Sequence, residues 1–234
     1  TKRRKISSLP LNWVLCLMAL TNMLDWAFPQ TIETIVSPIN GQVRIVKFQG
    51  KYNLWAGGAE QSGELVEKLW RDGLLKGIIS SQQQSIHKIL ILGLGAGSIV
   101  KVLHNIFPNL EKIVGVEIDP IIIDLGKKYF GLGNIPELRI VMSDANEYVT
   151  SLKEKFDLIV LDCYKGKNWD PNISSLKFVD SCQSKLNKGG LLVMNLLDFY
   201  FPKETRTLAF EIEKKYKILR VKQEYNILLF ISHW

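Results

Sequence analysis

A glycine-rich turn follows an apolar run near the middle of the chain. Residues 89–98 read ILILGLGAGS, which is typical of a buried strand, a tight turn and the start of a helix. Gly93, Gly95 and Gly97 let the backbone approach a ligand closely, and a helix N-terminus presents N–H groups. We therefore predict a nucleotide site at this turn, with a purely structural turn as the alternative. Ser98 stands where dinucleotide-binding turns carry their third glycine, which disfavours a nicotinamide cofactor.

Acidic residues follow the next three apolar runs. Glu117 ends the first of them, and its two carboxylate oxygens can accept the two hydroxyls of a ribose. Asp119 is expected to cap the helix that follows it. Asp144 can accept a hydrogen bond from an adenine amine or cap a helix, and Asp162 faces the same crevice. Because ligands bind at the carboxyl ends of parallel strands, these positions favour one shared nucleoside site.

The elements that position these residues follow an alternating pattern. Short apolar runs predict strands and the stretches between them predict helices, which is typical of a doubly wound α/β sheet buried on both faces. The last two apolar runs are only a few residues apart, so they are predicted to pair antiparallel. We expect strands at 88–92, 112–116, 138–142, 156–161, 190–196, 218–221 and 226–231, and helices at 98–107, 120–130, 145–152, 174–186 and 203–216.

A smaller region precedes this sheet. Apolar runs at 43–48 and 52–56 flank a glycine-containing turn and predict a β-hairpin, and the apolar spacing from 60 to 79 predicts a helix. We divide the chain into an N-terminal extension (1–38), a hairpin and helix region (39–80) and an α/β domain (81–234).

The N-terminal extension combines basic and apolar residues. Four basic residues at 2–5 precede a charge-free run at 6–24, whose unbroken apolar core is only residues 13–20. A helix of that length spans about 12 Å, which is too short to cross a bilayer. We expect a helix packed against the protein or a partner, with a helix at a membrane surface and an anchor or signal segment as alternatives.

Composition bounds the class of protein. The chain has 234 residues, of which 47% are hydrophobic and 23% charged, as in ordinary globular domains. Its net charge of +7 favours anionic partners, or is simply solvated surface charge. Cys16, Cys163 and Cys182 and three scattered histidines give neither a disulfide framework nor metal-ligand spacing. We expect a reduced, cytoplasmic protein with no bound metal.

Six short motifs are spread over residues 39–231. They are GGAEQS at 57–62, the glycine turn, VEIDP at 116–120, SDA at 143–145, the Leu-Asp pair at 161–162 and NKGGLLV at 187–193. Together they resemble the spermidine synthase family of class I S-adenosylmethionine-dependent transferases. The resemblance implies a Rossmann-like class I methyltransferase fold, with a mostly parallel seven-stranded sheet and an antiparallel last strand. It also implies a site for S-adenosylmethionine or its decarboxylated form, built from Gln61, Gly93, Gly95, Gly97, Glu117, Ile118, Asp144, Ala145 and Asp162.

Two positions depart from the aminopropyltransferases of that family. Those enzymes carry an Asp in the glycine turn and an Asp-x-x-Asp after the fourth strand, whose second Asp helps to deprotonate and hold the attacking amine. Here the two positions hold Ala96 and Lys165. A lysine, with a reference pKa of about 10.4, is a poor base and repels a cationic amine. We therefore expect methyl transfer, which needs little acid–base catalysis, and take Asp162 and Tyr164 as catalytic candidates.

Other functions stay open beside methyl transfer. The first alternative is a polyamine aminopropyltransferase that uses decarboxylated S-adenosylmethionine, and the second is a nucleoside-binding module without turnover. The acceptor is expected to be a small molecule of a class that the sequence does not specify. No nucleic-acid partner is expected, whereas a homodimer and a peripheral membrane contact through residues 1–28 are open alternatives.

Overall fold

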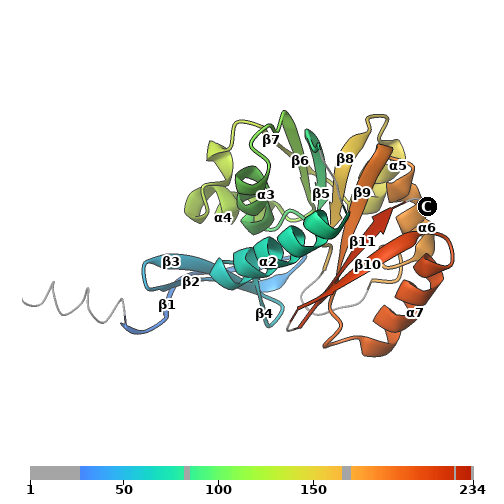
Figure 1. The fold of residues 1–234 in the computed structure, drawn as a ribbon. Helices are drawn as coiled ribbons and strands as arrows, with labels where there is room; N and C mark the ends of the chain where they lie inside the picture. The colour runs from blue at the N-terminus through green and yellow to red at the C-terminus, as the bar shows by residue number, and fades with distance from the viewer. Residues whose placement is uncertain (1–26, 82–84, 165–169, 224, 233–234) are drawn as a thin grey trace, which may run out of the picture.

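A seven-stranded sheet organises the chain in the computed structural model, which describes residues 27–81, 85–164, 170–223 and 225–232. The strand order is β10-β11-β9-β8-β5-β6-β7, and β11 runs antiparallel to both of its neighbours while the other pairs are parallel. This confirms the predicted Rossmann-like fold (Figure 1). The strands are β5 (Lys88–Leu92), β6 (Lys112–Glu117), β7 (Leu138–Met142), β8 (Phe156–Leu161), β9 (Leu186–Leu196), β10 (Lys217–Lys222) and β11 (Ile227–Ser232).

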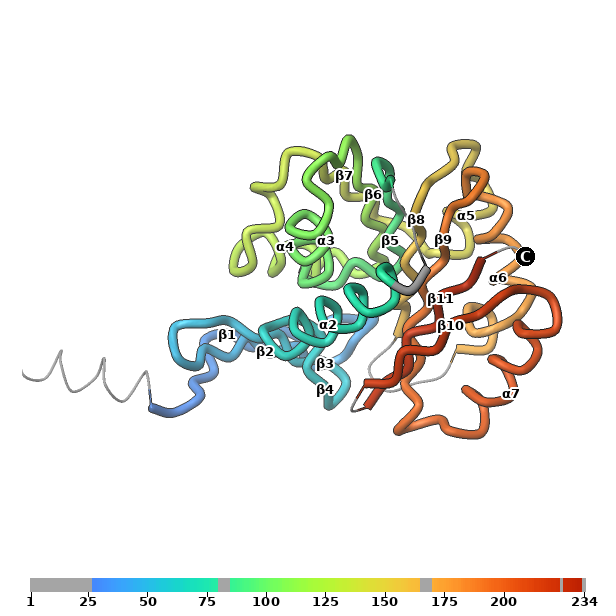
Figure 2. Tube along the Cα trace, in the orientation of Figure 1, coloured from blue at the N-terminus to red at the C-terminus, as the bar shows by residue number. Residues whose placement is uncertain are grey.

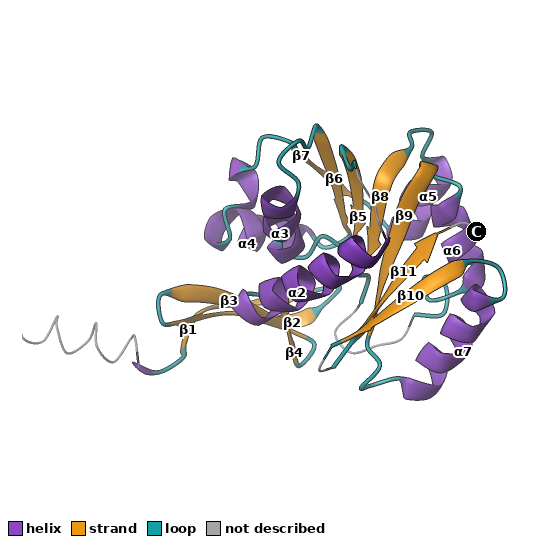
Figure 3. Cartoon of the chain, viewed as in Figure 1, coloured by secondary structure: helices purple, strands orange, loops and turns teal. Residues whose placement is uncertain are grey.

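Helices cover both faces of this sheet (Figure 3). One hydrophobic cluster joins the sheet to α5 (Ala145–Ser151), α6 (Leu176–Gln183) and α7 (Pro202–Glu213). A second cluster joins the opposite face to α2 (Glu64–Ser81) and α3 (Ser98–Ile106). Because both faces are covered, β5 and β8 are apolar and buried along almost their whole length, and for that reason their bounds match the prediction. The remaining helical elements are α4 (Pro120–Tyr129) and the short η1 (Leu132–Asn134).

A second, four-stranded antiparallel sheet is formed by the N-terminal region. It contains the predicted hairpin, and its strands are β1 (Gln30–Ser37), β2 (Gly41–Phe48), β3 (Lys51–Ala56) and β4 (Ala59–Ser62). Two expectations need correction. The boundary set at residue 38 cuts this sheet, because β1 pairs with β2. The helix expected from residue 60 begins at Glu64, because residues 59–62 pair with β3 instead.

A buried carboxylate joins the two sheets. Asp119 is fully buried and caps α4 by accepting the backbone N–H of Ile121 at 2.9 Å, as predicted. It also accepts hydrogen bonds from the Ser37 hydroxyl and, at 2.7 Å, from the Asn40 side-chain amide. One side chain therefore both starts α4 and holds the turn between β1 and β2. A small hydrophobic cluster fills the same junction: Val43, Ile45, Leu54, Ala56, Ala96, Ile122, Leu125 and Phe130.

Two glycines set the distance between α2 and the seven-stranded sheet. A Cβ atom on Gly73 would lie 2.4 Å from a methyl of Leu228, and one on Gly77 would lie 1.9 Å from the ring of Phe230. Both contacts are far below van der Waals separation, so only glycine fits there. The helix backbone therefore rests directly on β11 while its other end lies against the N-terminal sheet (Figure 2).

The expected apolar helix of residues 6–24 lies outside the described residues. Within the described ranges, none of the helices is both long enough and apolar enough to cross a membrane.

The first prediction concerns the Asp119 junction. Asp119→Ala is expected to lower the free energy of unfolding by about 2–4 kcal/mol, because it removes a helix cap and leaves buried hydrogen-bond donors without an acceptor. Urea denaturation measures the change. Asp124→Ala, at an exposed position of the same helix, is the matched control and should change stability by less than about 0.5 kcal/mol. Equal stability of the two variants would contradict the role given to Asp119.

Candidate active site

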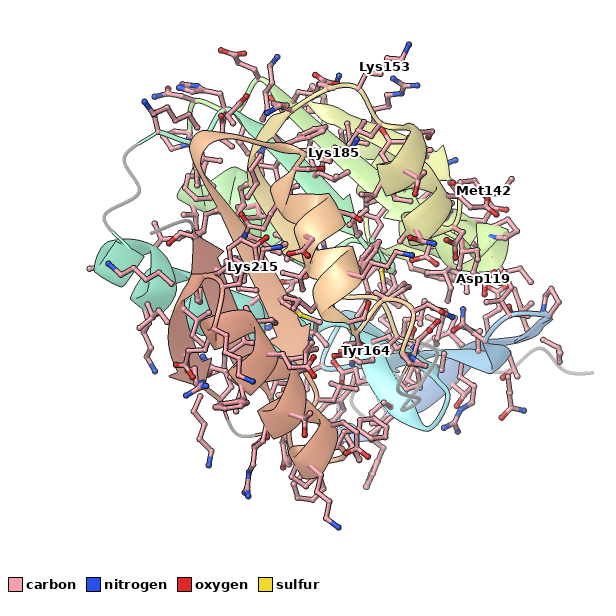
Figure 4. The ribbon with its side chains drawn as sticks, turned by 90° about the vertical axis from the view of Figure 1, so that its right-hand side faces the viewer. Asp119, Met142, Lys153, Tyr164, Lys185 and Lys215 are labelled. Carbon is pink, nitrogen blue, oxygen red and sulfur yellow. The ribbon has the colours of Figure 1, made fainter. Side chains whose placement is uncertain are left out.

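A cavity of about 620 Å³ opens at the carboxyl ends of β5, β6, β7 and β8. Its other walls come from β4, from the first half of α2 and from the connection between β10 and β11. Figure 4 labels Asp119 and Tyr164 at this end of the sheet, and Lys153 and Lys185 at the opposite end. Of the predicted site residues, the cavity wall contains Gln61, Gly93, Gly95, Glu117, Ile118, Asp144, Ala145, Asp162 and Tyr164.

The glycine turn brings two strand ends into contact. Gly93 has a φ of +86°, and a Cβ atom there would lie 2.2 Å from the carbonyl oxygen of Asp162. Gly97, which does not line the cavity, has a φ of +99° and would place a Cβ atom 2.4 Å from Leu132. Gly93 thus shapes the cavity, whereas Gly97 allows α3 to pack.

The N–H groups of the turn are already bonded within the protein. The Gly95 N–H donates to Glu117 at 2.8 Å, and the Ala96 N–H donates to the Ser62 hydroxyl at 3.0 Å. The Gly97 N–H donates to the carbonyl of Leu94 at 3.3 Å. The turn therefore has little capacity to bind a phosphate through these groups, so the site suits a nucleoside better than the predicted nucleotide.

Glu117 holds the glycine turn and the end of β6 through hydrogen bonds to backbone N–H groups. One carboxylate oxygen accepts the N–H groups of Ile118 at 3.0 Å and Asp119 at 3.1 Å, and the other accepts that of Gly95. Burial raises the pKa of the Glu117 carboxyl, and these N–H groups act against the rise. A carboxylate can accept about four hydrogen bonds, and three backbone N–H groups already donate to Glu117. The predicted contact with the ribose must therefore use the acceptor position that is left.

Asp144 has the predicted helix-capping role, and the predicted contact with an adenine amine stays a prediction. Its Oδ1 caps α5 by accepting the N–H groups of Asn146 at 2.8 Å and Glu147 at 3.1 Å. The side chain also lines the cavity, where Oδ2 is the atom available to an adenine amine.

Asp162 is held in a hydrogen-bond network. Its Oδ1 accepts the side-chain N–H of Asn195 at 2.8 Å, and the indole of Trp70 also donates to the carboxyl. Burial raises the pKa of Asp162 to about 6, against these two donors. The carboxylate is therefore mostly charged at neutral pH and can attract a cation.

Tyr164 is placed differently from the catalytic role that we expected. Its hydroxyl donates to the backbone carbonyl of Asn195 at 2.6 Å. Burial raises the pKa of this phenol well above its usual value. The geometry therefore argues against proton abstraction by Tyr164, and its ring forms part of the wall.

Glu60 is a candidate that the sequence analysis missed. It lies on β4 and lines the cavity, and its Oε1 is buried without a hydrogen-bond partner among the described residues. Burial and the neighbouring Glu64 raise the pKa of Glu60 to about 7, while the Leu65 N–H lowers it. The available signal was an acidic residue inside the small-residue motif GGAEQS, but residue 60 was assigned to a helix start.

The described wall of the cavity is acidic. Its one described lysine, Lys68, pairs with Asp72 at 2.7 Å. Ala96 is buried in the junction cluster and does not line the cavity, and Lys165 lies outside the described residues. The expected repulsion of a cationic amine is therefore not supported by the described wall. Six carboxyl side chains line it: Glu60, Asp72, Glu117, Asp144, Asp162 and Asp170.

No three His, Cys, Asp or Glu side chains are grouped as a metal site requires within the part of the chain that the structure describes.

The family model of the spermine/spermidine synthase domain matches residues 73–224. The chain belongs to this family. The polyamine aminopropyltransferase of Buchnera aphidicola subsp. Acyrthosiphon pisum is 32% identical over 137 residues, which cover 56% of this chain and 48% of that protein. The chain thus spans about half the length of this curated relative.

Two solved structures show how widely the fold is shared. The spermidine synthase of Thermotoga maritima has a TM-score of 0.71 at 18% identity, with 87% of this chain and 72% of that chain covered. Human methyltransferase-like protein 13 has a TM-score of 0.53 at 21% identity, with 72% and 82% covered. Proteins named for different reactions share this fold, so the reaction must be argued from the site.

The second prediction tests Glu117. Glu117→Ala should weaken the binding of methylthioadenosine by about 1.5–3 kcal/mol, because it removes a charged acceptor for the ribose and for the Gly95 N–H. Calorimetry measures the affinity, and circular dichroism checks the fold. Glu111→Ala, at an exposed position, is the control. Unchanged affinity in a folded Glu117→Ala protein would remove Glu117 from the binding site.

Proposed function

We propose that this protein is an aminopropyltransferase that uses decarboxylated S-adenosylmethionine and an aliphatic amine acceptor. This replaces methyl transfer, the function that we favoured from the sequence, by the first alternative. The family membership and the name of the Buchnera relative support the change. The observation that carries it is the acidic wall of the cavity.

The charge of the wall favours the decarboxylated donor. That donor carries a sulfonium and an ammonium, whereas S-adenosylmethionine adds a carboxylate. The described wall offers a carboxylate no cation other than Lys68, which is already paired with Asp72. At an effective dielectric of about 20, a unit charge about 6 Å away contributes roughly 3 kcal/mol before salt screens it. Even a third of that energy discriminates between the two donors.

Different residues of the cavity wall have different roles in the proposed reaction. Glu117, Asp144 and Asp162 all line the cavity. In this proposal Glu117 binds the ribose, Asp144 binds the adenine, and Asp162 attracts the cationic groups of the donor. The neutral acceptor nitrogen attacks the aminopropyl carbon, a C–N bond forms, and the C–S bond breaks with its electron pair going to sulfur. Methylthioadenosine leaves, and the new ammonium gives up a proton.

Two described carboxyls can take that proton near neutral pH. An efficient base has a pKa close to the working pH. Glu60, with a pKa of about 7, and Asp162, with a pKa of about 6, meet this condition.

The third prediction is donor and acceptor choice. The decarboxylated donor should bind about ten-fold more tightly than S-adenosylmethionine by calorimetry, and putrescine should yield spermidine and methylthioadenosine by chromatography. Asp162→Asn is the loss-of-charge comparison and should slow the reaction. Equal affinity for the two donors, together with no formation of spermidine, would refute the proposal. Formation of S-adenosylhomocysteine from S-adenosylmethionine and an added acceptor would support methyl transfer instead.

The fourth prediction concerns Glu60. Glu60→Gln should lower turnover by about 10²-fold and abolish the rise of kcat with pH near 7, because the carboxylate must be ionised to accept a proton. Burial raises the folded-state pKa above the ordinary glutamate pKa of about 4.5, so the wild type should also lose stability as pH rises from about 4.5 to 7, and the variant should not.

Glu64→Gln is the comparison variant for that experiment. Glu64 is the first residue of α2, is exposed and pairs with Lys51 at the surface. Because its charge helps to raise the pKa of Glu60, Glu64→Gln should keep the wild-type turnover and move the rise of kcat to lower pH. If both variants keep the wild-type pH profile, Glu60 is not the proton acceptor.

A further inference from the structure

We propose that Asn226 and Asn195 form an amide relay that holds the Asp162 carboxylate in position as the cation-binding group of the cavity. The amide relay consists of the side chains of Asn226, Asn195 and Asp162, which come from the β10–β11 connection, from β9 and from the end of β8. That the Asp162 carboxylate binds a cation rests on the proposed function. The relay itself rests on hydrogen bonds within the protein.

The bonds of the relay run in one direction. The side-chain amide of Asn226 donates to Oδ1 of Asn195 at 2.9 Å, and Nδ2 of Asn195 donates to Oδ1 of Asp162 at 2.8 Å. Asn226 is only 8% exposed and Asn195 only 5% exposed, so water cannot readily replace either bond.

The orientation of the Asn195 amide determines what Asp162 meets. An asparagine side chain presents a donor at one end and an acceptor at the other. Because Asn226 donates to the oxygen, the nitrogen of Asn195 faces Asp162. The reversed amide would place its oxygen against the carboxylate, which is favourable only if Asp162 is protonated.

The backbone of Asn195 is fixed independently of its side chain. Its carbonyl accepts the Tyr164 hydroxyl at 2.6 Å, and in the sheet the residue pairs with Leu228 of β11. The antiparallel strand β11 thus places Asn226 next to Asn195. Three segments distant in sequence meet at one carboxylate, which explains why the sequence motifs include Asp162 but neither Asn195 nor Asn226.

The charge around Asp162 makes the relay necessary. Glu117 and Asp144 line the same cavity, and the thiol of Cys163 and the phenol of Tyr164 adjoin the carboxyl. None of these groups is a cation, and Lys165 and Lys167 lie outside the described residues. In the described surroundings, the negative charge of Asp162 depends on two neutral donors, Asn195 and Trp70.

The test follows the titration of Asp162 in the protein without ligand, by NMR of the ¹³C-labelled aspartate carboxyl. Asn195→Leu should raise the midpoint by about 1–2 pH units, because a charge-assisted hydrogen bond is lost. Asn226→Leu should raise it by about half as much, because the Asn195 amide becomes free to rotate. In the Asn195→Leu background, Asn226→Leu should add nothing.

Gln183→Leu is the matched control. Gln183 is also a buried amide bonded to β11, through the carbonyl of Ile231 at 3.1 Å, but it does not line the cavity. It should lower stability and leave the Asp162 midpoint unchanged. The same midpoint in Asn226→Leu and wild type, or an undiminished shift in the double variant, would overturn the relay.

A wild-type measurement keeps the test decisive if a variant does not fold. The side-chain NH₂ signals of Asn195 should titrate with the midpoint of the Asp162 carboxyl, and their failure to do so would overturn the relay. Affinity for decarboxylated S-adenosylmethionine at pH 6.5 should fall about three- to ten-fold in Asn195→Leu. A shifted midpoint with unchanged affinity would leave the relay standing and refute the role of Asp162 in the proposed function.

Discussion

The close approach of Gly93 to the carbonyl of Asp162 is the contact on which the rest of the site depends. Leu92 accepts the Asp162 N–H at 2.8 Å, and both Gly93 and Leu94 donate to the carbonyl of Val116, at 3.0 and 2.9 Å. The ends of β5, β6 and β8 are therefore tied together within one turn. A Cβ atom at Gly93 would separate them, because it would lie 2.2 Å from the Asp162 oxygen. The carboxylates of Glu117 and Asp162 converge because the ends of their strands are held together at this point.

The second requirement is the contact between the two sheets at Ser62 and Gly63, which we call the seam. The Ser62 hydroxyl accepts the Ala96 N–H, and the Gly63 N–H donates to the Ser98 hydroxyl at 2.9 Å, so β4 is fastened directly to the glycine turn. Neither sheet alone encloses the cavity. Closing the seam removes water from Glu60 and Asp162, and this desolvation is the largest cause of the raised pKa of both carboxyls. Stability at the seam and acid–base behaviour in the cavity thus have the same origin.

The sequence predicted the elements that local pattern determines. The bounds of β5 and β8 agree with the structure because buried parallel strands are nearly unbroken apolar runs. The bounds of β7 also agree, although this edge strand is only half-buried and contains Arg139. β1 was missed because its apolar residues Ile32 and Val36 are exposed and mark no buried face, and β4 because its pairing with β3 competes with a helical pattern. The charge of the described wall could not be predicted for a related reason. The comparison with a family pattern used Ala96, which does not line the cavity, and Lys165, which lies outside the described residues. The chain-wide charge of +7 says nothing of a wall that is drawn from distant segments.

The contact of Gly73 and Gly77 with β11 bears on the size of the acceptor that we propose. At these two glycines the backbone of α2 contacts side chains of the sheet directly. The helix therefore cannot move closer to the sheet. The wall formed by the first half of α2 and the floor formed by the strand ends are therefore preformed, and little ordering remains to be done when a ligand enters. Each methylene group buried in such a slot contributes about 0.8 kcal/mol. Under the proposed function, aliphatic acceptors that differ by one carbon would therefore differ in binding free energy by about that amount.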